Sequence, residues 1–543
     1  MRYPLNAGMS LTVVALQVWL GVGVTMAQDL SAPRGVVSIP QPAGPAPRSV
    51  LTPQLPPGTP DAMVQADPAV PITTFVETLQ RAYWTNPALL AERARLRGTD
   101  YRLPQARAAY GPKLDYQASY GWQRDNFQQP VGGYRAYSGW GYTASAILTL
   151  PLMTFGRNAA GETSALAQID FERANVRFSE AQTLLDAIKA YTAVLSDRAG
   201  VDIAADNLAL LTRELSDNRA RFKAREVTST DVQQVETRVE QGRAQLLTAQ
   251  RLAASSEASY LRVVGAPAGR LEPPNPLELP VNTLEDAYAY AEAHSPVIGG
   301  AVAREKISRA QKNLARADLL PQVELRGNAD YGKTTPFNGN LYQSELRGQV
   351  VISGPIFESG LRRARLAEAE ALNDADWRLI DDAERSNKAE VADAWNEWLT
   401  QRASIDRLQA SMVSAQLAYD GALLQERAGL RTTLDVLDLA RELLNARSGF
   451  NAASANAYVA QARIMSALGA LELPNLLPDA PSYDPEVHFA KVRHNGDVPL
   501  LTPLLRGIDG IFGGNSMADR PARDPASSVG ARGVDVPVPT SGK

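Results

Sequence analysis

Two halves of the chain repeat one another, and this repeat restricts the possible folds more than any other feature. Proline and glycine positions carry much of the match, which makes chance similarity between alanine-rich helices a poor explanation. The matched segments are Asn86-Pro87 with Ser295-Pro296, Pro112 with Pro321, Pro151–Gly156 with Pro355–Gly360, Thr228 with Thr432, Asp231-Val232 with Asp435-Val436, and Gly265 with Gly469. We therefore expect one structural unit that occurs twice, with one loop shorter in the second copy.

The spacing of proline predicts long helices in both copies. Proline is absent between Pro151 and Pro267, and again between Pro355 and Pro474. Because proline costs about 3 kcal/mol inside a helix, each of these spans favours a long helical region. Apolar residues also recur at heptad spacing, as coiled-coil seams do. The seams run through Leu184, Ile188, Tyr191 and Leu195, through Val201, Leu208, Leu215 and Phe222, and through Val436, Leu443, Phe450, Ala457 and Ile464.

The sequence divides into five segments. Arg2 followed by the apolar stretch 11–24 indicates a signal peptide at 1–27, with cleavage expected after Ala27. A proline-rich linker at 28–70 follows. We assign repeat 1 to 71–272 and repeat 2 to 280–474, each beginning with a helix. The β-hairpins are expected at 111–152 and 320–356, the helical hairpins at 156–265 and 360–470, and an irregular Pro/Gly-rich tail at 475–543.

The predicted strands alternate between an apolar, aromatic face and a strongly polar face. Leu114, Tyr116, Tyr120 and Trp122 share one face of the first strand, and the other three strands show the same alternation. A soluble sandwich has a similar pattern, but charged polar faces on isolated hairpins favour a membrane barrel. Four strands cannot close a barrel, and unpaired edges are not tolerated in lipid. Three chains would close a twelve-stranded wall, although two or four chains would also close one.

Composition excludes several classes of function. The chain has no cysteine, which removes disulfides, thiolate metal sites and any lipid anchor attached through cysteine. Its three histidines lack the spacing of a zinc protease site, and a net charge of −4 disfavours nucleic-acid binding. No nucleotide-binding loop or catalytic triad is recognisable. We expect a protein without enzymatic activity, cofactor or metal.

Several motifs resemble the TolC-like outer membrane efflux proteins over roughly residues 71–474. Residues 429–438 (GLRTTLDVLD) match the family turn G-x-R-T-x-x-D-V-L-D, and residues 466–469 (SALG) match its terminal element. The segment 355–360 (PIFESG) resembles the family's strand-to-helix junction. The first repeat departs from this pattern, with Met153 where phenylalanine is usual and Arg225 where the second repeat has Gly429.

The resemblance implies a mainly α-helical chain that trimerises. Four strands per chain would form a twelve-stranded outer-membrane β-barrel, continued through the periplasm by a long α-helical coiled-coil barrel. Such homotrimers contact outer-membrane lipid and dock, through a periplasmic adaptor protein, with a proton-driven or ABC transporter of the inner membrane. Small-molecule efflux and type I protein secretion both remain open. The alternative outside the family is a periplasmic coiled-coil scaffold without a pore.

Asp435 and Asp438 are the predicted periplasmic gate. They lie three residues apart on one helix face, so a trimer would stack two rings of carboxylates, which select cations in channels. The alternative for Asp435 is an ordinary helix-capping role near the turn. By the resemblance, Arg431 ties one hairpin to its neighbour through Thr230 and Asp231. The alternative for that tether is an ordinary surface ion pair.

The turns at 222–231 and 426–435 are the predicted sites of adaptor docking. Phe222 and Thr228 represent the first turn, and Gly429 and Thr432 represent the second. Gly429 suits a tight turn, because a positive φ angle is easy for glycine. The family motif is nearly absent from the first turn, which makes docking there a weaker expectation.

Overall fold

The computed structural model describes residues 70–129, 131–333 and 343–512. The predicted signal peptide at 1–27, nearly all of the predicted linker at 28–70 and the tail beyond residue 512 lie outside these residues. Among the described helices, none combines the length and apolar character needed to cross a membrane.

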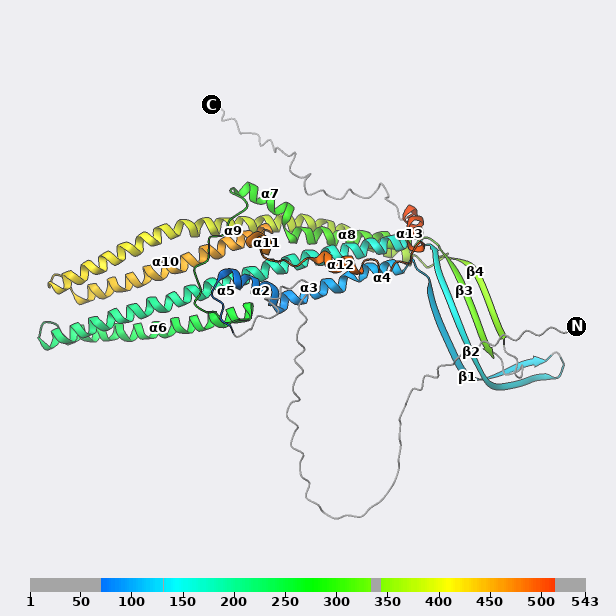
Figure 1. Ribbon diagram of the computed structural model, residues 1–543, viewed down its shortest axis with the longest axis horizontal. Helices are drawn as coiled ribbons and strands as arrows, with labels where there is room; N and C mark the ends of the chain where they lie inside the picture. The colour runs from blue at the N-terminus through cyan, green and yellow to red at the C-terminus, as the bar shows by residue number, and fades with distance from the viewer. Residues whose placement is uncertain (1–69, 130, 334–342, 513–543) are drawn as a thin grey trace, which may run out of the picture. The chain divides into compact units, whose positions relative to one another are not determined.

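The order of the elements confirms the tandem repeat (Figure 1). Repeat 1 contains α2 (Phe75–Thr85), α3 (Pro87–Asp100), α4 (Arg102–Ala108), β1 (Lys113–Gln129), β2 (Gly133–Met153), α5 (Arg157–Lys223) and α6 (Ser229–Val264). Repeat 2 contains α7 (Leu284–His294), α8 (Pro296–Ala317), β3 (Gln322–Lys333), β4 (Gln343–Ser353), α9 (Leu361–Arg427) and α10 (Thr433–Leu468). Helices α5 and α9 each have 67 residues, and α6 and α10 each have 36.

Matched residues in the two repeats play the same structural roles at the ends of the helices. Gly156 and Gly360 precede α5 and α9 with φ angles of 88° and 85°, and Gly265 and Gly469 end α6 and α10 with φ angles of 79° and 74°. Left-handed backbone of this kind costs glycine little. Thr228 and Thr432 then cap α6 and α10, each in a capping box with the aspartate three residues on.

The main core lies where α2, α5, α6 and α10 meet. Trp84 of α2, Ile188 and Tyr191 of α5, Tyr260 of α6 and Met465 of α10 are all buried in one cluster. The long helices α5, α6, α9 and α10 lie side by side, with α10 in contact with both α9 and α5 (Figure 1). Leu184, Ile188 and Tyr191 are fully buried, so the predicted heptad seam is a real packing surface.

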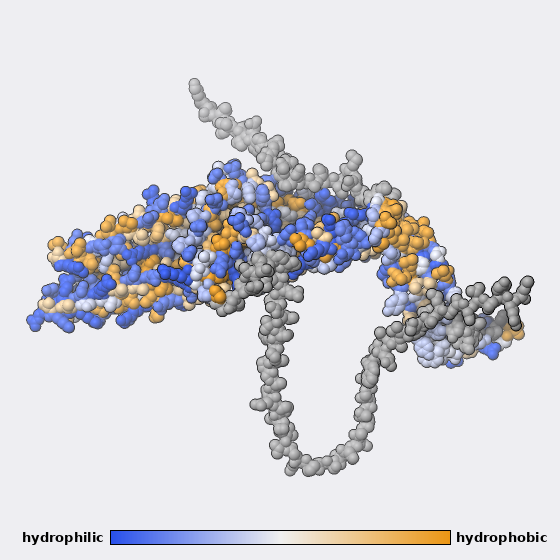
Figure 2. Space-filling view, viewed as in Figure 1, coloured by the Kyte–Doolittle hydropathy of each residue, from blue (hydrophilic) through white to orange (hydrophobic). Residues whose placement is uncertain are grey.

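The four strands form one antiparallel sheet in the order β1-β2-β3-β4. The register places Tyr116 beside Ala146, Ala146 beside Ala329, and Ala329 beside Leu346. The apolar faces of all four strands therefore coincide, as the sequence pattern predicts, and the polar residues share the opposite face. Hydrophobic residues gather over part of this sheet in Figure 2. Strands β1 and β4 are edges without a partner in the described chain.

The prediction of an irregular tail at 475–543 is wrong for its described part. After the short α11 (Leu473–Leu476), residues beyond 480 form α12 (Pro485–Val492) and α13 (Leu501–Phe512). Asp484 caps α12, and His488 Nδ1 lies 2.6 Å from Asp100 Oδ2 of α3. Helix α12 packs on α3, and α13 packs on α5 and β2. These partners are remote in sequence, so local composition did not reveal the helices.

Candidate gate and hairpin-docking site

The two helical hairpins end in turns with the same backbone, despite different sequences. In the second turn Gly429 has a φ angle of 76°, and in the first turn Arg225 takes the same left-handed conformation with a φ angle of 61°. Equivalent hydrogen bonds close both turns, from Glu226 N to Arg221 O and from Leu430 N to Gln425 O, each at 2.9 Å. The departure from the family motif at Arg225 therefore does not change the shape of the turn.

The predicted docking residues fall into two groups. Phe222 is exposed in the first turn, and Leu430 and Leu434 are exposed in the second, so both turns present apolar side chains. Thr228 and Thr432 instead use their hydroxyl groups locally, donating to Asp231 at 2.8 Å and to Asp435 at 2.9 Å. These threonines fix the helix starts, and the apolar side chains beside them are free to contact another protein.

Both predicted gate aspartates lie near the start of α10, but each has a partner within the chain. The exposed Asp435 accepts hydrogen bonds from the hydroxyl and backbone N–H of Thr432, which hold the pKa of its carboxyl below the usual range. Asp438 lies 3.4 Å from Arg238 of α6 and 3.4 Å from Arg441 of α10. Capping thus accounts for Asp435 in a single chain, and the carboxylate rings stay a prediction for the trimer.

Within one chain, Arg431 does not meet its predicted tether partners. Arg431 is exposed and forms no ion pair with any residue that the structure describes. The carboxylate of Asp231 instead accepts hydrogen bonds from Thr228. The tether from Arg431 to Thr230 and Asp231 therefore remains a prediction about contacts between neighbouring chains.

A buried polar cluster, absent from the sequence-based prediction, links the two hairpins of one chain. The inter-hairpin cluster consists of Glu214, Asn218 and Arg221 of α5, Glu426 of α9 and Thr433 of α10. Arg221 forms an ion pair with Glu426. The Thr433 hydroxyl lies 3.2 Å from Asn218 Oδ1 and 3.3 Å from Glu426 Oε1, and Asn218 Nδ2 donates to Glu214 at 2.6 Å. Only Arg221 is partly exposed, so solvent barely reaches these bonds.

An apolar contact reinforces the polar cluster. Leu437 of α10 is buried among Val232, Val235 and Val239 of α6, together with Leu211 of α5. The first turn of α10 therefore packs on the other hairpin through both polar and apolar groups. Leu437 belongs to the turn motif at 429–438, but Glu214 and Asn218 belong to no motif and to none of the predicted heptad seams, so the sequence did not reveal the cluster.

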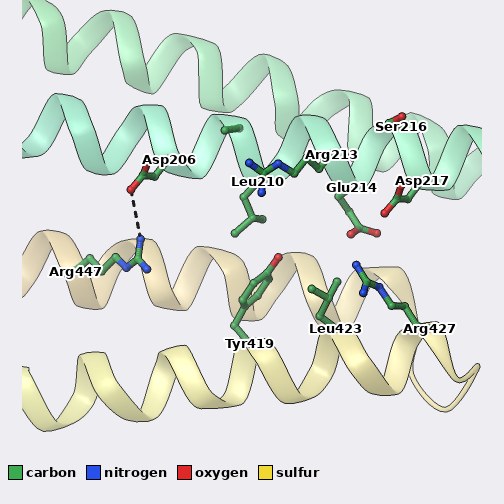
Figure 3. A pocket seen from close by; sticks show the side chains of 11 residues that line it. Asp206, Leu210, Arg213, Glu214, Ser216, Asp217, Tyr419, Leu423, Arg427 and Arg447 are labelled. Atoms are coloured by element: carbon green, nitrogen blue, oxygen red, sulfur yellow. Dashed lines mark ion pairs between the residues drawn. The ribbon is translucent and has the colours of Figure 1, made fainter.

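A groove of about 540 Å³ adjoins the cluster between α5 and the second hairpin (Figure 3). In Figure 3, Glu214 of α5 and Tyr419 and Arg427 of α9 reach into the space between the helices. Burial raises the pKa of Glu214, and the nearby Glu426 raises it further. Two acidic side chains, each more than nine-tenths buried, thus share the cluster with one arginine.

Neutralising Glu214 should strengthen the association of the hairpins. Because the pKa of Glu214 is raised above its ordinary value of 4.5 in the folded protein, the native state binds that proton more tightly than the unfolded chain. Its contribution to stability therefore falls as pH rises from that value through the raised pKa. We expect Glu214→Gln to raise the thermal unfolding temperature of the protein at pH 7. Acidification should then stabilise the variant less than it stabilises the wild type. An equal pH response in both proteins would contradict this assignment.

Comparisons with known proteins agree with this architecture. A family model described as "Outer membrane efflux protein" matches residues 78–266 and 287–470. The chain is 28% identical to outer membrane efflux protein BepC of Brucella suis, over 77% of this chain and 90% of BepC. It is 25% identical to outer membrane protein TolC of Escherichia coli (74% of this chain, 83% of TolC) and 24% identical to alkaline protease secretion protein AprF of Pseudomonas aeruginosa (70% and 80%).

Solved structures share the fold. The outer membrane protein VceC of Vibrio cholerae superposes with a TM-score of 0.62 at 20% identity, over 72% of this chain and 95% of VceC. The outer-membrane channel OprN superposes with a TM-score of 0.64 at 20% identity, over 76% of this chain and 96% of OprN. The family match falls on both repeats and leaves α12 and α13 outside it.

Proposed function

This chain belongs to the outer membrane efflux protein family, and we propose that it forms a trimeric outer-membrane exit duct. Substrates delivered by an inner-membrane pump and a periplasmic adaptor would pass through it passively. The observation that carries this function is the open sheet of four strands with one apolar face and two unpaired edges. Such a sheet satisfies its backbone in lipid only when neighbouring chains complete a closed barrel.

The exposed side chains of the sheet argue against a soluble periplasmic scaffold. Tyr116 is 89% exposed, Leu346 88% and Ile352 71%, all on the same face. A soluble protein rarely leaves an apolar patch of this kind in water. Purified protein should form heat-modifiable trimers and conduct ions as single channels in a planar bilayer. A soluble, detergent-free protein without conductance would contradict the duct.

The gate prediction concerns ion selectivity. We expect the double variant Asp435→Asn/Asp438→Asn to lose most of the preference for cations, because the carboxylate rings would disappear. The reversal potential under a KCl gradient measures this preference. The hydrogen bonds from Thr432 hold the pKa of Asp435 below its usual range, so wild-type selectivity should persist at mildly acidic pH. Arg238→Gln is the matched control, because it removes the ion pair with Asp438 but keeps both carboxylates.

The tether prediction concerns the closed state of the trimer. If Arg431 bonds Thr230 and Asp231 of a neighbouring hairpin, Arg431→Ser would let the hairpins relax outward. We expect cells that carry this variant to become more sensitive to large antibiotics that normally leak in slowly. Unchanged leak with normal trimer levels would count against the tether.

The partners follow from the same proposal. Relatives named for efflux and for alkaline protease secretion match at similar identity, so both pump classes fit this chain. We propose that the turns at Phe222 and Gly429, with the capped helix starts at Thr228 and Thr432, receive the adaptor. Cross-linking from positions 222 and 430 to an adaptor encoded beside this gene would test this docking surface and identify the pump class.

A further inference from the structure

Helix α13 lies outside the residues that match the family model. The side chain of Asp509 holds it by hydrogen bonds at the junction between β2 and α5. The Asp509 side chain, in a residue only 2% exposed, accepts hydrogen bonds from the backbone N–H groups of Thr154, Gly156 and Ala159 at 3.1, 2.9 and 3.1 Å. The Thr154 hydroxyl donates to the same carboxylate at 2.7 Å. Because Gly156 has no side chain to cap α5, Asp509 supplies the cap from a remote segment.

The charged residues of α13 are engaged with the protein. Thr502, Leu505 and Asp509 form the buried face of the helix. Arg506 forms an ion pair with Glu162 of α5 at 2.8 Å. Arg506 and Asp509 are the only charged residues in α13, so its remaining surface has no charge of its own.

The outward face of α13 is apolar. Leu500, just before the helix, is 89% exposed and Leu504 is 58% exposed, with Pro503 and Gly507 exposed between and beside them. Hydrophobic residues gather over α13 and the adjoining part of the sheet in Figure 2. The apolar surface of the sheet therefore extends past the end of its strands onto this helix.

We propose that α13 is an interfacial helix, which rests on the lipid leaflet at the helical end of the sheet with Leu500 and Leu504 inserted. This inference rests on the proposed function, because it takes the apolar face of the sheet as the lipid-facing one. Strand β2 leaves the hydrocarbon near Met153, where α13 is fixed, which is the depth at which amphipathic helices lie in a membrane. Helix α13 would thus help to hold at the membrane a chain that has no cysteine to which a lipid could be attached.

Lipid fits this face better than a neighbouring chain does. Chains that complete the barrel must join at the edge strands β1 and β4. Helix α13 instead packs against β2, an interior strand of the sheet. The face of α13 therefore lies at a strand that needs no partner chain.

Site-specific fluorescence quenching tests this placement. Because the chain has no cysteine, Leu504→Cys gives a single labelling site for a fluorophore in the full-length trimer. The trimer is reconstituted in vesicles of phosphatidylethanolamine and phosphatidylglycerol, with a fraction of the lipid nitroxide-labelled near the start of the acyl chain. Leu346→Cys on the apolar face of β4 and Leu417→Cys on α9 are the matched controls, since both leucines are strongly exposed.

We expect the labels at 504 and 346 to lose fluorescence to a similar extent, and the label at 417 to keep it. Quenching at 346 without quenching at 504 would overturn the interfacial helix and leave the duct intact. Absence of quenching at both positions would overturn the proposed barrel as well. Self-quenching at 504 that disappears when labelled and unlabelled chains are mixed would show that a second copy covers this face, which also overturns the proposal.

Discussion

Replacing Arg221 with alanine is expected to loosen the two helical hairpins and to raise the passive leak through the duct. The substitution leaves Glu426 buried beside Glu214 without its cation. Removing one partner from a fully buried ion pair costs about 3–5 kcal/mol, and the partial exposure of Arg221 reduces this to about 2 kcal/mol. Uptake of a large antibiotic by whole cells measures the leak, and heat dissociation of the purified trimer measures the stability.

Arg219→Ala is a closely matched control for Arg221→Ala. Arg219 lies two residues earlier on α5 and also forms an ion pair, with Glu236 of the same hairpin at 2.6 Å. That pair is exposed and links no second hairpin, so its loss should cost about 0–1 kcal/mol without added leak. Adding Glu426→Gln to Arg221→Ala should restore much of the stability by removing the orphaned charge. Equal leak from both arginine variants would show that the inter-hairpin cluster does not hold the closed state.

The repeat made most of the fold predictable from the sequence. Residues such as Gly156, Gly265 and Thr228 act locally, through a left-handed turn or a capping box, and each recurs at its matched position. Periodicity predicted the two faces of the sheet for a similar reason, because strand geometry alone assigns alternate residues to opposite faces. Signals of these kinds can be recognised in the sequence without knowing which segments are in contact in the fold.

Contacts between remote segments were not predictable in the same way. Glu426 and Arg221 lie in different repeats, and neither belongs to a motif, so only the packed structure shows their ion pair. The capping role of Asp509 was not predictable for the same reason, since its partners Thr154 and Gly156 lie far away in the sequence. The predicted tether at Arg431 differs from these contacts, because its proposed partners belong to a neighbouring chain and not to a remote segment of the same chain.

Asp509→Ala is expected to detach α13 and to weaken the junction between β2 and α5. The substitution leaves the backbone N–H groups of Thr154 and Gly156 without their acceptor at a site that water does not reach. Loss of a helix cap costs about 0.5–2 kcal/mol, and an unsatisfied buried donor adds about 1–3 kcal/mol. We therefore expect the trimer to lose about 2–4 kcal/mol of stability. The heat-dissociation temperature of the trimer reports this loss, and limited proteolysis reports the release of α13 (Leu501–Phe512).

Asp484→Ala separates the role of Asp509 from the general effect of removing a capping aspartate. Asp484 caps α12 through one exposed hydrogen bond, to Glu486 N at 2.8 Å, so its loss should cost about 1 kcal/mol or less. Asp509→Asn keeps one acceptor oxygen for Thr154 and Gly156 and should lie between wild type and Asp509→Ala. The order wild type, Asn, Ala in protease resistance is what a remote cap requires. Equal losses from Asp484→Ala and Asp509→Ala would mean that α13 contributes only ordinary packing to the junction.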